Sequence, residues 1–261
     1  MRMAIHTRTL KGLILPGIII AIWVSGAGLS IWNNYIIPSP ADVIGAGYKL
    51  LLSGALIKHV LTSLYRVFAG FFAAFLLAFP LGILLGMNAR YREYFQGILE
   101  FVRHVPPLAA LPMLILWFGI GEWPKLLIVV LATFFPIFLN TLHGVASCDV
   151  KLIEVGKSFG LKGRETFRRI VLPAALPSVL VGMRLGLGYS WRALVGAELI
   201  AASSGIGYMI LDAEQLARPD IVVLGILTIG ILGTVIDWLF FRLTKRFIPW
   251  NGDEDASYGR G

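Results

Sequence analysis

Charged side chains inside apolar stretches are the residues of this sequence best placed to act on a solute. A charge within a membrane-spanning segment is unfavourable, and it normally faces the protein interior or a water-filled path. Such positions indicate groups that can line a solute pathway, and the positive ones among them favour an anion. The charged residues in or beside apolar stretches are Arg66, Arg103, Arg184, Arg192 and Glu198.

These residues also have a structural alternative. They can lie near helix ends, extend to the membrane surface, or pair internally, as Arg192 and Glu198 can. His104 beside Pro106 can be a proton relay or a hydrogen-bonded histidine at a kinked helix, and Trp191 can be an interfacial anchor. The residues that we retain as candidates for a translocation pathway are Arg103, His104, Arg184, Trp191 and Glu198.

The sequence does not predict covalent chemistry by this chain. Gly156-Lys157-Ser158 matches the end of a phosphate-binding loop, but that loop needs a glycine five positions before the Gly-Lys pair, where Lys151 stands. Cys148 is the single cysteine, and the histidines lack metal-ligand spacing. We therefore expect no catalytic residue, no cofactor, no metal site and no ATP hydrolysis by this chain.

The composition places the chain in the membrane class. Hydrophobic residues make up 57%, charged residues 15%, and the mean hydropathy is +0.79. We expect an all-α membrane protein of about six spans, each near the length that crosses a bilayer. The expected spans are residues 10–31, 60–87, 95–119, 124–147, 176–202 and 221–247. A short amphipathic interfacial helix is expected to begin near Pro40, and the first segment can be a retained span or a cleaved signal peptide.

The distribution of basic residues predicts the orientation. The formal net charge is +8, and Lys and Arg gather at both ends of the chain and in residues 151–169. By the positive-inside rule, both termini and this loop are cytoplasmic. Nucleic-acid binding is excluded, because the charge follows the ends of apolar segments. We expect three regions: 1–55, with the first span and the interfacial helix; 56–250, the transmembrane domain; and 251–261, a disordered tail.

The basic loop is expected to form a helix, a glycine turn and a second short helix. Leu152, Val155 and Phe159 recur at helical spacing and share one face, and Gly160 suits the left-handed position that ends a helix. Such a helix can present apolar side chains to the groove of a partner. The alternative is a solvated basic face next to anionic lipid.

The same loop resembles the signature E-A-A-x3-G-x9-I-x-L-P of ABC importer permeases. The matching residues are Glu154, Gly160, Ile170, Leu172 and Pro173, whereas Val155 and Gly156 replace the two alanines. Further stretches resemble the branch that contains nitrate, taurine, aliphatic-sulfonate and bicarbonate permeases. They are Ile37-Pro38-Ser39-Pro40, Ser63-Leu64-Tyr65-Arg66 with Gly70, residues 103–109 and 116–121, Gly182-Met183-Arg184, Trp191, Ala197-Glu198 and Gly205-Ile206-Gly207.

This resemblance implies a type I ABC importer permease (MetI-like) fold with a cytoplasmic coupling helix between spans four and five. It also implies a multi-pass protein of the bacterial inner membrane. The partners would be two ABC ATPase subunits, a second copy of this chain, a periplasmic or lipid-anchored substrate-binding protein and the lipid bilayer. The residues expected to dock the ATPase are Glu154, Val155, Gly156, Phe159, Gly160, Leu161, Ile170, Leu172 and Pro173.

The solute is open at this stage. The resemblance favours a small anion such as nitrate, a sulfonate, taurine or bicarbonate, moved inward by alternating access. The same machinery can import a neutral or cationic nutrient, such as a pyrimidine or a vitamin precursor. A less favoured alternative is an ion-driven secondary transporter, for which Glu198 would be the mid-membrane acidic residue.

Overall fold

The structure, a computed structural model, describes the backbone of residues 2–247 and the side chains of residues 14–246, and within this range it is entirely helical. The prediction of an all-α fold is thereby confirmed. The tail at 251–261 lies outside the described residues. In chain order the helices are α1 (Arg2–Gly28), α2 (Pro40–Leu52), α3 (Ala55–Met87), α4 (Ala89–His104), η1 (Pro107–Ala110), α5 (Leu111–Phe118), α6 (Glu122–Ala146), α7 (Val150–Ser158), α8 (Gly163–Thr166), η2 (Phe167–Val171), α9 (Leu172–Ala201), α10 (Ile206–Gln215) and α11 (Pro219–Phe247).

Four of the described helical segments are long and apolar enough to cross a membrane. They are Ala55–Met87, Glu122–Ala146, Gly163–Ala201 and Pro219–Arg246. A fifth span is present if the bent pair Ala89–His104 and Pro107–Phe118 counts as one. The described apolar part of α1, Ile14–Gly28, is shorter than a full span. The count of six spans therefore stays a prediction.

The span predicted at 95–119 bends sharply, at the place of the kink that is expected beside Pro106. The chain bends by 84° between α4 and the pair η1–α5. Val105 and Pro106 both have extended backbone there, with ψ of 117° and 125°. The physical reason is the pair Pro106-Pro107, because a proline forces the residue before it out of the helical region and lacks the N–H that a helix needs.

The chain divides into two compact units, which we describe separately. In the described residues, one unit comprises 2–61 and 204–230. Its helix α2 begins at Pro40, as predicted, with a capping box in which Ser39 and Asp42 bond each other's backbone N–H. Within this unit, His59 Nδ1 accepts a hydrogen bond from the backbone N–H of Gly205 at 3.1 Å.

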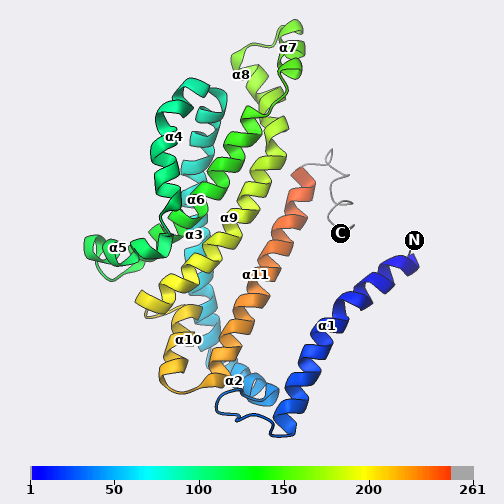
Figure 1. The fold of residues 1–261 in the computed structure, drawn as a ribbon, viewed down its shortest axis with the longest axis vertical. Helices are drawn as coiled ribbons and strands as arrows, with labels where there is room; N and C mark the ends of the chain where they lie inside the picture. Colours follow the sequence, from blue (N-terminus) through cyan, green and yellow to red (C-terminus); the bar gives the residue numbers. More distant parts are fainter. Residues whose placement is uncertain (1, 248–261) are drawn as a thin grey trace. The chain divides into compact units, whose positions relative to one another are not determined.

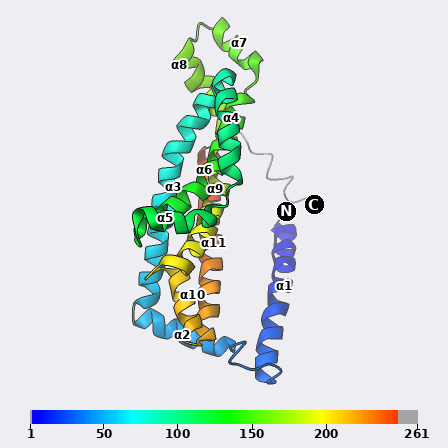
Figure 2. The same cartoon turned by 60° about the vertical axis from the view of Figure 1, so that its left-hand side comes forward.

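The other unit comprises residues 62–203 and 231–247, and its centre is helix α6. Figures 1 and 2 show α3, α6 and α9 running side by side. Two glycines explain the close approach. A Cβ on Gly82 of α3 would lie 2.7 Å from Thr141 Cβ, and one on Gly182 of α9 would lie 2.6 Å from Asn140 Cβ. The helix faces that carry Gly82 and Gly182 therefore pack within this chain, against α6.

The second half of the loop between α6 and α9 runs into α9 without a break. Helices α8, η2 and α9 form one helical run, Gly163–Ala201, of which η2 is a π-helical turn. This wider turn lies directly before Pro173, where an α-helical hydrogen bond would be lost. The α7–α8 corner lies at the end of the α6–α9 pair (Figure 1).

Candidate functional site

Helix α7 forms the predicted cytoplasmic-loop helix and has a defined start and end. The Asp149 carboxylate caps its start by accepting a hydrogen bond from the Lys151 N–H at 2.9 Å. At its end, the Leu161 N–H bonds to the Gly156 carbonyl at 3.0 Å and the Gly160 N–H to the Lys157 carbonyl at 2.9 Å. This is a Schellman motif with Gly160 at φ +80°, the left-handed position that favours glycine. The predicted helix–glycine–helix turn is confirmed.

The outer face of α7 is apolar and exposed. Leu152, Val155 and Phe159 share it, and Phe159 is 83% exposed. Glu154 is also exposed, next to this face. Leu152 and Val155 belong to α7 itself, and Phe159 is the residue that caps its end.

The inner face of α7 is seated on η2 through Gly156. This glycine is buried, and a Cβ there would meet the terminal methyl of Ile170 at 2.3 Å and Leu161 Cδ1 at 3.5 Å. Glycine at this position lets Ile170 reach the α7 backbone. Leu172 and Pro173 begin α9 directly after this contact and are half-buried. The structure thus brings Gly156, Leu161 and Ile170 together in one small core, whereas Glu154, Val155 and Phe159 face outward.

Five polar residues form a buried ion-pair network that joins three helices. Arg66 on α3 is 1% exposed and Glu198 on α9 is 0% exposed, and the Arg66 Nη1 donates to Glu198 Oε1 at 2.8 Å. Arg66 Nε and Nη2 donate to the two oxygens of Glu122 on α6, each at 2.6 Å. Ser63 Oγ donates to Glu198 at 2.9 Å, and Lys125 Nζ donates to Glu122 at 2.9 Å.

Among these five residues, two cations face two carboxylates. A buried charge is stabilised only when it is paired and hydrogen-bonded, and both conditions hold for Arg66 and Glu198. The structure therefore supports the internal-pairing alternative for Arg66. Sequence reasoning missed the role of Glu122 as a partner of Arg66, of Ser63 as a partner of Glu198 and of Lys125 as a partner of Glu122. Of the network, the sequence could have indicated only the ion pair between Glu122 and Lys125, which are three positions apart at the start of a helix.

The other sequence-predicted pathway residues lie at separate places. Arg184 forms a two-bond ion pair with Asp237 on α11, both bonds at 2.7 Å. Glu198 pairs with Arg66 rather than with Arg192, the partner that the internal-pairing alternative names, and the Arg192 Cζ lies 5.8 Å from the centre of the Tyr189 ring. His104 Nδ1 lies 2.6 Å from the Glu100 carbonyl oxygen, in agreement with the hydrogen-bonded histidine of a kinked helix.

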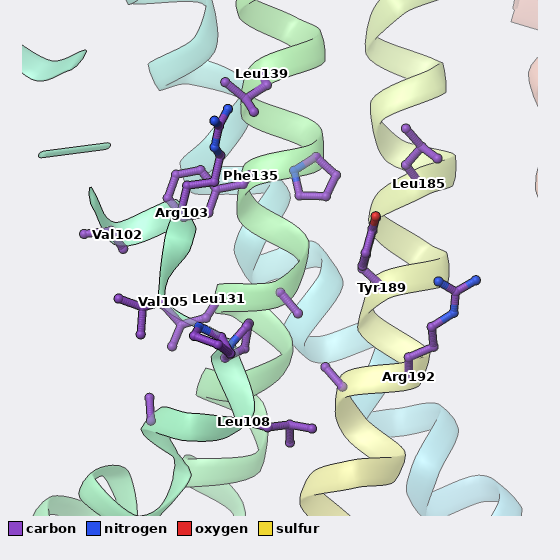
Figure 3. A pocket seen from close by; sticks show the side chains of 16 residues that line it. Val102, Arg103, Val105, Leu108, Leu131, Phe135, Leu139, Leu185, Tyr189 and Arg192 are labelled. Carbon is purple, nitrogen blue, oxygen red and sulfur yellow. The ribbon is translucent and has the colours of Figure 1, made fainter. Parts of the chain in front are cut away.

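A cavity of about 680 Å³ lies between α4–η1, α6 and α9. Its walls are mainly aliphatic and aromatic, and its polar groups come from Arg103, Tyr189 and Arg192. In Figure 3, Phe135 and Leu139 of α6 lie beside Arg103 of α4, and Leu185 and Tyr189 come from α9. Of the predicted pathway residues, Arg103 lines this cavity. Its size lies in the range of small-molecule sites.

Comparison with known proteins identifies the class. A family profile described as the binding-protein-dependent transport system inner membrane component matches residues 78–249. This match covers more than half of the chain, and the chain belongs to this family. It is therefore a transport permease of the inner-membrane component type rather than an enzyme.

Several named relatives extend over nearly the whole chain. It is 39% identical over 247 residues to a putative aliphatic sulfonates transport permease protein, SsuC, of Bacillus subtilis, covering 95% of this chain and 90% of the relative. It is 36% identical to the taurine transport system permease protein TauC of Escherichia coli, covering 90% of this chain and 88% of TauC. It is 28% identical to the nitrate import permease protein NrtB of Synechocystis, covering 93% and 90%.

The fold is also found in a solved transporter. An inward-facing structure of the MetNI methionine ABC transporter matches with a TM-score of 0.60 and 19% identity, covering 75% of this chain and 97% of the matched chain. At this identity the likeness establishes the fold alone, which is that of a type I importer permease.

Proposed function

We propose that this chain is the membrane-spanning subunit of an ATP-driven ABC importer that moves a small oxyanion inward by alternating access. The observation that carries the proposal is the family match together with relatives named for aliphatic sulfonates, taurine and nitrate. These three solutes share an anionic group with three oxygens. A neutral or cationic nutrient is the alternative cargo.

The ATPase docks on α7. Phe159, Val155 and Leu152 offer an apolar face for a groove of the partner, with Glu154 beside it. The Schellman turn at Gly160 and the contact of Gly156 with Ile170 connect that face rigidly to η2 and α9. Leu161, Leu172 and Pro173 complete this connection. A movement of α7 would then be transmitted along α9, which borders the cavity of Figure 3.

The complete importer in this proposal contains two copies of the chain, two ATPase subunits that hydrolyse ATP, and a substrate-binding protein. Both termini and the α7–α8 corner lie in the cytoplasm, because the basic residues gather there. Residues 1–55 form a first span with an interfacial helix, residues 56–250 the transmembrane domain, and residues 251–261 a disordered cytoplasmic tail. The pathway candidates are Arg103, His104, Arg184, Trp191 and Glu198.

The test is transport by the reconstituted complex. The chain, its ATPase and its binding protein are placed in proteoliposomes, and ATP-dependent accumulation of labelled taurine, butanesulfonate, nitrate and thiamine is measured. Accumulation of at least one oxyanion, and none of the thiamine cation, is expected. Transport of thiamine alone would replace the anion assignment, and accumulation driven by a proton gradient without ATP would overturn the importer class.

A further inference from the structure

A second cavity, which shares Arg192 with that of Figure 3, lies between α9 and α11 beside Val67 of α3. Its volume is about 360 Å³, many times the roughly 30 Å³ that one water molecule occupies in the liquid. Its polar lining comes from Arg184, Trp191, Arg192, Thr234 and Asp237, and Gly188 and Gly233 form part of its wall.

Trp191 brings to this cavity a buried hydrogen-bond donor without an acceptor. The residue is 7% exposed, and its Nε1 has no hydrogen-bond partner among the residues that the structure describes. A Cβ placed on Gly233 would lie 3.8 Å from both Trp191 Nε1 and Cδ1, so the N–H edge of the indole faces the Gly233 wall of the cavity. A buried N–H without a partner is unfavourable, and an indole N–H can only donate. The missing group is therefore an acceptor.

The charges around the cavity decide what kind of acceptor fits. Arg184 holds both oxygens of Asp237, which neutralises that carboxylate. Arg192 is not ion-paired among the described residues, and its side chain extends from α9 on the side away from α6 (Figure 3). Two arginines against one aspartate leave a formal charge of +1 on the lining. A positive field with an unsatisfied N–H favours an anion and disfavours a cation.

The glycines of the wall set the space beside the donor. A side chain at position 233 would contact the Trp191 indole, but Gly233 has none. Nothing lies within 4 Å of a Cβ placed on Gly188. The wall of the cavity thus carries no side chain at either glycine, and the volume of the cavity lies at the lower end of small-molecule sites.

We infer that this cavity is an oxyanion site in the translocation pathway, in which Trp191 Nε1–H and the Arg192 guanidinium hold the oxygens of a sulfonate or nitrate group. Arg184 and Asp237 position the site by holding α9 to α11. The inference rests on the proposed function and deepens it, because it gives the permease its own recognition of the anionic head group. Gly233 limits the size of the group that can stand beside the indole.

Direct binding tests the inference without transport. The permease–ATPase complex is placed in nanodiscs without binding protein or ATP, and trifluoromethanesulfonate is titrated while its ¹⁹F NMR line width is recorded. Trp191→Phe keeps an aromatic ring and removes the N–H. Its expected effect is about a tenfold weaker affinity, the factor that corresponds to about 1.4 kcal/mol. Trp238→Phe on α11 is the matched control, since Trp238 is exposed and does not line the cavity.

A second variant keeps the inference testable if Trp191→Phe fails to fold. Gly233→Ala places a methyl at ordinary contact distance from the indole, so the fold tolerates it, and it should weaken binding of the probe several-fold. Unchanged affinity in both variants, no binding by the wild type, or equal binding of a tetramethylammonium probe would each overturn the site. Normal ATP-driven uptake by the wild-type complex together with any of these results would leave the importer assignment intact.

Discussion

Removing Arg66 is the perturbation for which the structure gives the clearest magnitude. Arg66→Met replaces a guanidinium that is 1% exposed by an apolar chain of similar length. Glu198 then remains as a fully buried carboxylate beside Ser63 without its cation, whereas the half-exposed Glu122 keeps Lys125. Breaking a buried pair by removing one partner destabilises by about 3–5 kcal/mol. Most of this loss is expected to come from Glu198, because solvent screens Glu122.

The double variant Arg66→Met with Glu198→Gln should therefore be more stable than Arg66→Met alone. The glutamine amide has no charge to bury, and Glu122 and Lys125 remain as a neutral pair. We expect the second substitution to restore about 2–3 kcal/mol, the size of coupling measured between residues in one network. Arg218→Met is the control, since Arg218 pairs with Asp220 at the surface and should lose only about 0–1 kcal/mol.

The assay is reversible unfolding in mixed detergent micelles, followed by far-UV circular dichroism, for the wild type, both single variants, the double variant and the control. The pairing account predicts a free energy of unfolding for the double variant that lies above that of Arg66→Met. If the double variant were less stable than Arg66→Met, with the two losses simply adding, the network would not be coupled and the reasoning would be refuted.

Three further predictions concern single positions. Ala217→Gly should raise the free energy of unfolding by about 1 kcal/mol, because Ala217 has φ +52°, a left-handed conformation that is unfavourable for alanine. Gly160→Ala should lower it by about 1 kcal/mol, because Gly160 has φ +80° in the same region. Thr133→Val should leave the free energy of unfolding unchanged or raise it by about 1 kcal/mol, since the buried Thr133 hydroxyl has no partner among the described residues. A decrease of more than about 1 kcal/mol would show that the hydroxyl makes a hydrogen bond. Burial, and then the nearby Asp149 carboxylate, raise the pKa of the Cys148 thiol above its ordinary value, so alkylation should be slow at neutral pH and rise with alkaline pH, and fast labelling at neutral pH would contradict this.

The cytoplasmic loop could be predicted from the sequence because its signals are local. Helical spacing of Leu152, Val155 and Phe159 and a glycine at position 160 determine a helix and its end within a dozen residues. The structure confirms both. What the loop docks is a property of a partner, and the pattern of this chain alone gives it only through the family resemblance.

The size of the bend after α4 and the partners in the ion-pair network escape sequence reasoning for different reasons. Hydropathy predicts an apolar segment at 95–119, and its prolines predict a kink, but neither signal gives the angle through which Pro106 and Pro107 turn the chain. The network joins Arg66 to Glu198 across 132 positions, and helical periodicity holds no information on pairs so far apart.

The central claim is that this chain transports only with an ATPase bound at α7. The measurement that tests it most directly is affinity purification of the tagged chain from its native membrane, with the co-purifying proteins identified and counted by mass spectrometry. We expect an ABC ATPase in amounts comparable to the chain, lost with Gly160→Asp or Phe159→Asp and kept with the control Leu216→Asp, which also places a charge at an exposed apolar position. An ATPase retained at the wild-type level by both loop variants would contradict docking at α7, and a chain that supports uptake with no ATPase bound would contradict the importer account itself.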